Sequence, residues 1–137
     1  MAHQFPYDAD MTPTDLRLNI SEINRRIRAA ECAADRPPGA VSLLAVSKKK
    51  TTELIRCAPQ AGLTDFGENY AQEMAEKAAR LSDLGLTWHF IGPIQSNKTG
   101  LIAEFSDWVH SVDRLKIAQR LSDQRPPEKG PLKVLLQ

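Results

Sequence analysis

Side chains that could do chemistry lie in four short segments of this 137-residue chain. The segments are Ser47-Lys48, Gly67-Glu68-Asn69-Tyr70, His89 to Gln95, and His110-Ser111-Val112-Asp113. Each stands at the end of a short apolar run of the kind that forms a β-strand. In α/β folds, ligand-binding side chains concentrate at the carboxyl ends of the strands. The four segments are therefore the candidate site.

Lys48 is the candidate for covalent chemistry. Strand alternation puts Leu44, Val46 and Lys48 on one face, and the run around them is apolar enough to be covered on both faces. A lysine in that position would be partly desolvated, and desolvation frees an amine to act as a nucleophile, as in Schiff-base lysines. The alternative is that Lys48-Lys49-Lys50 only marks the exit of the strand into water, and composition alone favours it.

The other polar residues also have structural alternatives. Asn69 follows a Gly67-Glu68 turn and could contact a ligand or cap the next helix, which is the commoner use. His89 lies between aromatic neighbours, where a hydrogen-bonded structural histidine is at least as frequent as a catalytic one. His89 and His110 lack an evident set of acidic or sulfur partners, so we expect no metal site.

The segment from Gly92 to Lys98 is a loop that runs into a helix, and Ser96 is the residue that could cap it. A helix N-terminus can hold a phosphate group. The chain has no G-x-G-x-x-G and no G-x-x-x-x-G-K-[ST] pattern, however. Binding of a dinucleotide or of a nucleoside triphosphate is therefore not indicated.

Five short strands with helices between them would bring these segments together. The strand candidates start about every 20 to 25 residues: Val41–Ser47, Leu63–Phe66, Thr87–Ile91, Trp108–Val112 and Leu132–Leu136. Helices are expected over Thr52–Ala58, Asn69–Leu84, Ser96–Phe105 and Asp113–Leu121, the first of them cut short by Pro59. Strand and helix alternating five times predict an α/β fold with a parallel sheet.

A longer helix is expected ahead of the first strand. Thr12-Pro13-Thr14-Asp15 supplies a capping threonine, a proline at the first helical position and an acid at the third. One apolar face follows at steps of four and three, formed by Leu16, Ile20, Ile23, Ile27 and Ala30. The helix should end near Ala34, before two consecutive prolines. Residues 1–12 are expected to be a flexible tail, and residues 13–137 the folded domain.

Composition excludes several classes of protein. Hydrophobic residues make up 42% and charged residues 26%, which favours a packed core over disorder. The net charge of +1 gives no general attraction to nucleic acid or to an anionic membrane. The N-terminal residues have no signal-peptide pattern, and no apolar run approaches the roughly 20 residues that span a bilayer. Cys32 and Cys57 form no C-x-x-C pair. We expect a cytoplasmic protein.

The candidate segments closely resemble those of the pyridoxal 5'-phosphate homeostasis proteins (the YggS/PROSC family). The matching stretches are Leu44 to Lys48, Phe66 to Tyr70, Trp88 to Lys98 and His110 to Leu115. The family's leading helix is matched as well. Four motifs in the same order and at the same spacing make the resemblance specific, and it covers nearly all of the chain from about Thr14 onward.

This resemblance implies a fold like the N-terminal domain of alanine racemase, a (β/α)8 TIM-type barrel that carries pyridoxal phosphate. The chain would form a leading helix and about five parallel strands of it. By the resemblance, Lys48 is the Schiff-base lysine, and Asn69, His89 and Ser111 occupy positions near the cofactor. The implied function is intracellular homeostasis of pyridoxal phosphate, by a non-catalytic carrier without established turnover.

Two other functions stay open. One is a racemase-like pyridoxal-phosphate enzyme with Lys48 as its base, although no segment of the sequence supplies the opposing acid/base group. The other is a truncated fragment with no independent function, because the chain stops inside the apolar run from Lys133 to Gln137. The resemblance places the family's phosphate-binding loops in a part that the chain does not cover. A partial barrel would leave an unpaired strand edge, so self-association is expected.

Overall fold

The chain folds into five parallel β-strands joined by helices, and the computed structural model describes residues 11–137. The strands are β1 (Ala45–Val46), β2 (Asp65–Glu68), β3 (Thr87–Phe90), β4 (Trp108–Val112) and β5 (Lys133–Leu136). The helices are α1 (Pro13–Ala33), α2 (Thr52–Cys57), α3 (Ala71–Arg80), α4 (Thr99–Phe105) and α5 (Leu115–Gln124). Short 3₁₀ helices occupy Pro59–Ala61, Ser82–Leu84, Ser96–Lys98 and Pro127–Lys129.

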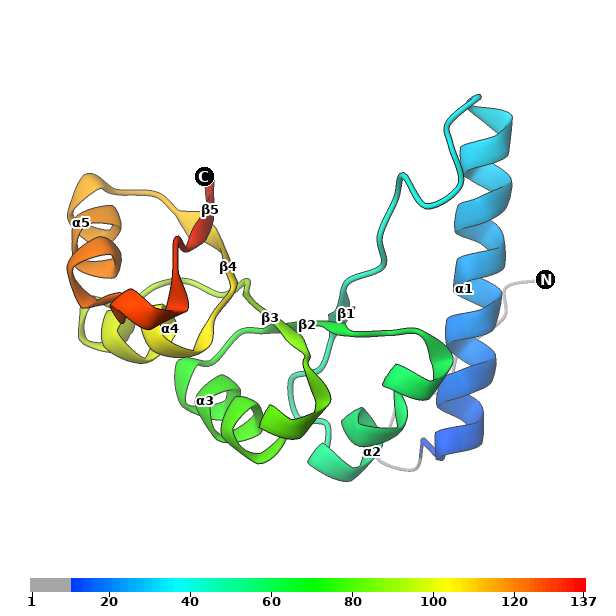
Figure 1. Ribbon diagram of the computed structural model, residues 1–137, viewed down its shortest axis with the longest axis horizontal. Coiled ribbons are helices and arrows are strands. Elements are labelled where there is room, and N and C mark those ends of the chain that lie inside the picture. The colour runs from blue at the N-terminus through cyan, green and yellow to red at the C-terminus, as the bar shows by residue number, and fades with distance from the viewer. Residues whose placement is uncertain (1–10) are drawn as a thin grey trace.

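The strands lie in the sheet in the order in which they occur in the sequence. Each of them pairs in parallel with the next, from β1 through to β5. In Figure 1 the strands follow an arc, and α2 to α5 lie on its outer, convex side. A doubly wound sheet would carry helices on both faces, whereas a (β/α)8 barrel carries them on the outside alone. The arrangement is that of successive βα units of a barrel, and the α/β prediction is confirmed.

The predicted start of the leading helix is confirmed in detail. Thr12 caps α1, with its hydroxyl oxygen accepting from the Asp15 backbone N–H at 3.2 Å. A second hydrogen bond completes the capping box, in which the Thr12 N–H donates to Asp15 Oδ2 at 3.0 Å. Two backbone donors that the helix itself cannot satisfy thereby gain partners. Of the predicted apolar face, Ile20 is buried, whereas Ala30 is exposed.

The first predicted strand is much shorter than expected. Of Val41–Ser47, only Ala45 and Val46 join the sheet. Residues near Val41 follow α1 instead, because the Glu31 carboxylate accepts the Val41 N–H at 2.7 Å and the Gly39 N–H at 3.1 Å. The expectation of a strand covered on both faces is wrong as well, since Val46 is 51% exposed.

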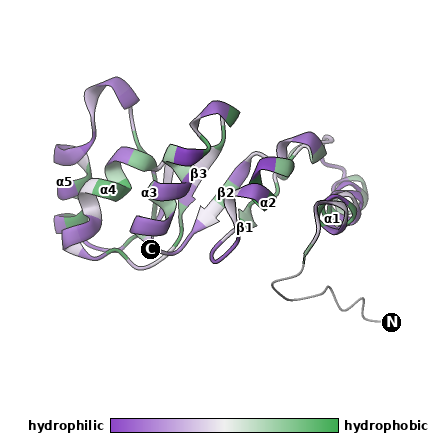
Figure 2. Ribbon diagram, turned by 90° about the horizontal axis from the view of Figure 1, so that it is seen from below, coloured by the Kyte–Doolittle hydropathy of each residue, from purple (hydrophilic) through white to green (hydrophobic). Residues whose placement is uncertain are grey.

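The core lies between the convex face of the sheet and the helices. The strands contribute Phe66, Trp88, Phe90 and Val109, all buried and all on the helix-facing side. The helices contribute buried apolar side chains from one face each, among them Met74, Ile102, Ile117 and Leu121. In Figure 2, α3, α4 and α5 each carry both green hydrophobic and purple hydrophilic residues. This is the pattern of helices that bury one face and solvate the other.

The structure covers only the last two residues of the predicted N-terminal tail. The predicted tail comprises residues 1–12, of which residues 1–10 lie outside the described residues. No helix within residues 11–137 is both long enough and apolar enough to cross a bilayer.

Removing the Ile102 side chain tests the placement of the core. Ile102 is 0% exposed within the core cluster, so Ile102→Ala leaves a cavity that the neighbours fill only in part. We expect a loss of about 2–5 kcal/mol in the free energy of unfolding, measured by urea denaturation. Leu115→Ala is the control, because Leu115 is 83% exposed and its loss should cost little. Equal losses in the two variants would contradict this core.

Candidate functional site

Lys48 directly follows β1 and is exposed. The pairing of β1 with β2 continues one step past the strand, where the Ser47 N–H donates to the Gly67 carbonyl at 3.0 Å. The Ser47 hydroxyl faces the helix side and donates to Glu68 Oε1 at 2.5 Å. Lys48 begins the turn after Ser47, and strand alternation continued by one residue would place its side chain on the opposite, concave side. Among residues 11–137, nothing forms a hydrogen bond or ion pair with the Lys48 side chain.

The expected burial of Lys48 is therefore not observed. The structure has the alternative arrangement, in which the three lysines mark the exit of the strand into water. Lys48 and Lys49 are exposed and Lys50 is half-buried.

Asn69, Gly92 and Ser111 bring the ends of three strands into contact. A Cβ atom on Gly92 would lie 2.2 Å from the Asn69 carbonyl oxygen, so the close approach of these two loops requires glycine. The Ser111 hydroxyl donates to the Gly92 carbonyl. The Asn69 Oδ1 atom is buried and has no hydrogen-bond partner within the described part of the chain. The capping predictions for Asn69 and Ser96 are both wrong, because neither helix start has a side-chain cap.

His89 lies apart from these three residues, on the concave face of β3. Its Nε2 is 3.0 Å from Asp65 Oδ1, and its Nδ1 is 3.0 Å from His110 Nε2. The ring is stacked against Trp108, with centroids 5.8 Å apart and planes 2° from parallel. A carboxylate only accepts, so Nε2 of His89 carries a proton, whereas the donor in the contact with His110 depends on the tautomers of the two rings. Burial, with a further contribution from His89, holds the pKa of His110 below its usual 6.5.

Both ring nitrogens of His89 are thus engaged by the protein. This fits the structural alternative for His89 better than a role in proton transfer. The fold brings one acidic partner, Asp65 of β2, to His89, which the sequence did not indicate. Among residues 11–137 no group of three or more potential ligands is arranged to hold a metal ion.

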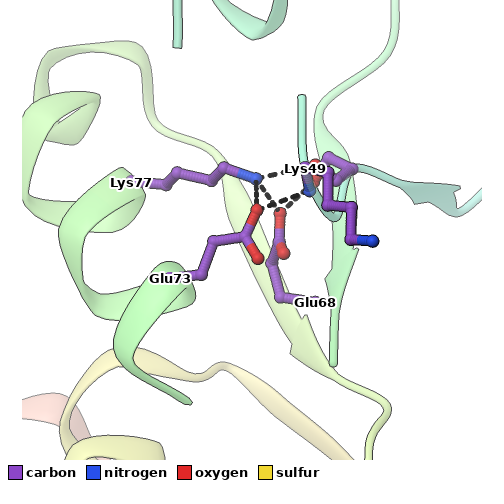
Figure 3. A network of polar contacts seen from close by, with 5 residues as sticks. Lys49, Glu68, Glu73 and Lys77 are labelled. Atoms are coloured by element: carbon purple, nitrogen blue, oxygen red, sulfur yellow. Dashed lines mark hydrogen bonds and ion pairs between the residues drawn. The ribbon is translucent and has the colours of Figure 1, made fainter. Parts of the chain in front are cut away.

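A buried ionic cluster joins the ends of β1 and β2 to α3 (Figure 3). Lys77 Nζ donates to the Ser47 carbonyl oxygen at 2.6 Å, and to Glu68 Oε1 and Glu73 Oε1 at 2.7 Å each. Lys77 is 5% exposed and Glu68 0% exposed. Three acceptors match the three N–H bonds of an ammonium group, so the buried cation is fully hydrogen-bonded. Ser47, Glu68, Glu73 and Lys77 are called the Lys77 cluster below.

Glu73 extends the Lys77 cluster to the turn that carries Lys48. Its Oε1 atom also accepts the backbone N–H of Lys49 at 2.6 Å. Burial raises the pKa of Glu73, but the hydrogen bonds from Lys77 and from the Lys49 N–H, with the charges of both lysines, outweigh it. The pKa of Glu73 is therefore held below its usual 4.5.

Glu73 and Lys77 lie outside the four candidate segments of the sequence. Two signals were available: the i,i+4 spacing of the pair on one helix, and the position of Glu68 at the end of an apolar strand. Neither signal reveals burial, because glutamate–lysine pairs at this spacing are also common on solvated helices.

A pocket of about 340 Å³ opens between the loops that follow β2 and β3. It is lined by Asn69, Tyr70, Phe90, Pro93, Gln95 and Lys98, among others. Asn69 therefore borders this pocket, whereas Lys48 does not.

The chain is similar in sequence to known proteins over most of its length. No family model matches the chain. It is 63% identical over 119 residues to the pyridoxal phosphate homeostasis protein of Pseudomonas aeruginosa, covering 87% of this chain and 52% of the relative. It is 49% identical over 126 residues to the protein of the same name from Escherichia coli K12, covering 90% and 54%. The resemblance to pyridoxal phosphate homeostasis proteins is confirmed. The chain spans about half the length of these homeostasis proteins.

Solved structures agree with this result. PipY of Synechococcus elongatus, solved with pyridoxal phosphate bound, has a TM-score of 0.61 and 44% identity, covering 77% of this chain and 47% of PipY. A protein from Bifidobacterium adolescentis described as unknown has a TM-score of 0.79 and 30% identity, covering 93% and 56%. The similarity of this chain to known proteins thus extends from sequence to fold.

Replacing Glu73 by glutamine tests the charge of the Lys77 cluster. The pKa of Glu73 is lower in the folded than in the unfolded chain, so its stabilising effect is present above about pH 4.5 and is lost as pH falls through the folded value. Glu73→Gln should therefore lower the free energy of unfolding by about 1–3 kcal/mol at pH 7 and by progressively less below pH 4.5 or so. Urea denaturation at several pH values measures the difference.

The matched control is Glu76→Gln on the exposed side of the same helix, where the carboxylate only accepts from Gln72. A constant difference between wild type and Glu73→Gln across this pH range would contradict an ionic role for Glu73.

Proposed function

We propose that this chain binds pyridoxal 5'-phosphate through Lys48 and serves its intracellular homeostasis. The observation that carries the proposal is the exposed Lys48 at the carboxyl end of a strand, which has no partner among residues 11–137, in a chain 49–63% identical to proteins named for this function. The bound pyridoxal phosphate in PipY supports the proposal independently.

The residues of this chain fit the aldehyde end of the cofactor. Lys48 would hold the cofactor at its aldehyde carbon, where a lysine amine can form a C=N bond with loss of one water molecule and without an oxidant or further reactant. The Lys48 amine has no partner among residues 11–137 that would compete for it. The buried Asn69 Oδ1 on the neighbouring strand end is an unused acceptor for a ligand's donor. Asn69, His89 and Ser111 belong to the proposed binding site by their match to the family motifs.

The phosphate end has less support in this chain. Barrels of this type commonly build their phosphate site after strands seven and eight, and residues 11–137 contain five strands. The bond to Lys48 would then supply most of the affinity. Binding by this chain should consequently be weak and reversible.

The proposed role is to hold the cofactor, without turnover. Racemisation needs a second acid/base group opposite the lysine. Among the proposed site residues, His89 has the side chain best suited to act as an acid or base. Asp65 and His110 occupy both of its ring nitrogens, however. We therefore assign Lys48 the role of covalent anchor and assign no residue the role of catalytic acid.

Exchange of substrate hydrogen separates the holding role from the enzymatic one. We expect alanine deuterated at its α-carbon to keep its deuterium when incubated with the protein and pyridoxal phosphate, as it does with free pyridoxal phosphate alone. Mass spectrometry of the recovered alanine measures the retention. Exchange that is faster than with the free cofactor, and that Lys48→Arg abolishes, would establish the racemase-like alternative.

Charge-preserving variants test Lys48 as the anchor. Arginine keeps the positive charge but cannot replace the lysine amine in this condensation. After incubation with pyridoxal phosphate and reduction with borohydride, Lys48→Arg should carry at least tenfold less label than wild type. Lys49→Arg, the control one residue away, should keep its label at position 48. Peptide mapping by mass spectrometry gives the labelled positions, and label spread evenly over surface lysines of the wild type would refute the assignment.

A further inference from the structure

We infer that Glu73 and Lys77 of α3 are positioning residues for Lys48, which they orient through the two peptide groups on either side of it. The inference rests on the proposed role of Lys48 and concerns residues that do not themselves touch a ligand. It explains how one of three consecutive lysines is selected.

The Lys77 cluster forms hydrogen bonds with the two backbone peptide groups that flank Lys48. The Ser47 carbonyl belongs to the peptide group before Lys48, and it accepts from Lys77 Nζ at 2.6 Å. The Lys49 N–H belongs to the peptide group after Lys48, and it donates to Glu73 Oε1 at 2.6 Å. Fixing both peptide planes fixes the direction of the Cα–Cβ bond between them.

The two bonds act as one unit because their side chains are joined. Lys77 Nζ and Glu73 Oε1 lie 2.7 Å apart, one helical turn from each other on α3. Figure 3 shows the side chains of both residues extending from α3 toward the backbone at Lys49. Bonds to charged groups are about twice as strong as neutral ones, and the burial of Lys77 keeps water from competing. The bonds from Lys77 to the Ser47 carbonyl and from the Lys49 N–H to Glu73 are together called the tether below. The tether therefore holds the backbone more firmly than the bonds of an ordinary surface turn do.

The backbone of the turn also needs such support. Lys49 has φ +60°, a left-handed conformation that costs a non-glycine residue free energy. The turn is closed by a bond from the Lys50 N–H to the Ser47 carbonyl at 3.0 Å, the same oxygen that Lys77 holds. Without the tether, the turn would relax toward commoner conformations. The amines of Lys48, Lys49 and Lys50 would then become more nearly equivalent.

The choice of variants follows from the burial of the cluster. Lys77→Met would leave Glu68 and Glu73 without their cation, and an unpaired buried charge of that kind can unfold a small domain. Glu73 is the better target, because its carboxylate is at the partly exposed end of the cluster, with a side chain 26% exposed. Glu73→Ala removes the acceptor for the Lys49 N–H, whereas Glu73→Gln keeps an oxygen that can accept it. Glu76→Ala is the exposed control.

Labelling with pyridoxal phosphate and borohydride, followed by peptide mapping, measures the selection among the three lysines. In the wild type and in Glu76→Ala we expect most of the label on Lys48. In Glu73→Ala the ratio of label on Lys48 to label on Lys49 plus Lys50 should fall at least threefold, and Glu73→Gln should restore part of it. A merely stabilising role would lower the melting temperature without changing this ratio. An unchanged ratio in folded Glu73→Ala overturns the inference.

Amide hydrogen exchange at Lys49 tests the tether without any ligand. The Lys49 N–H should exchange at least tenfold faster in Glu73→Ala than in the wild type, and no faster in Glu76→Ala. If wild-type label scatters over many lysines while Lys49 exchange still depends on Glu73, the proposed function fails and the tether stands. If exchange at Lys49 is unchanged in folded Glu73→Ala, the inference fails whatever the labelling shows.

Discussion

One buried ammonium group connects the parts of this protein that surround its candidate site. Lys77 Nζ binds the backbone at the end of β1, the side chain at the end of β2 and a carboxylate of α3. Burying an ammonium group costs much free energy unless its N–H bonds find acceptors, and here three donors meet three acceptors. The requirement to satisfy this ammonium therefore dictates how closely the first two strands and α3 must approach. The same hydrogen bonds fix the position of the turn that carries Lys48.

The rest of the site follows from the parallel order of the sheet. Parallel strands that pair in sequence order, with α2 to α5 on the convex side, have all their carboxyl ends at one edge, where successive loops meet. Gly92 lets the loops after β2 and β3 touch, and Ser111 adds the end of β4.

The concave face of the sheet carries polar side chains that bond to one another. Asp65, His89 and His110 satisfy one another there, which gives a polar row bonded within the protein.

The local elements could largely be predicted because each depends on a short-range rule. The Thr12–Asp15 capping box, the short second helix before Pro59 and the alternation of strands with helices all rest on neighbours within a few residues. The structure of Val41–Ser47 was harder to predict from the sequence, because its apolar pattern is typical of a buried strand although only Ala45 and Val46 join the sheet. Competition from the Glu31 carboxylate, ten residues before Val41, draws the start of this segment away from the sheet.

The sequence by itself determined the fold class, the leading helix and, through its motifs, the resemblance to the homeostasis proteins, and it supplied the four segments of the candidate site. The tertiary structure alone decided which polar residues face one another. It gave His89 an acidic partner, left Asn69 without a capping role, exposed Lys48, and buried Glu68 and Lys77 together. The physical reason is that burial and pairing of polar groups depend on strand register and helix packing. Those are contacts between residues far apart in the chain, and no local pattern encodes them.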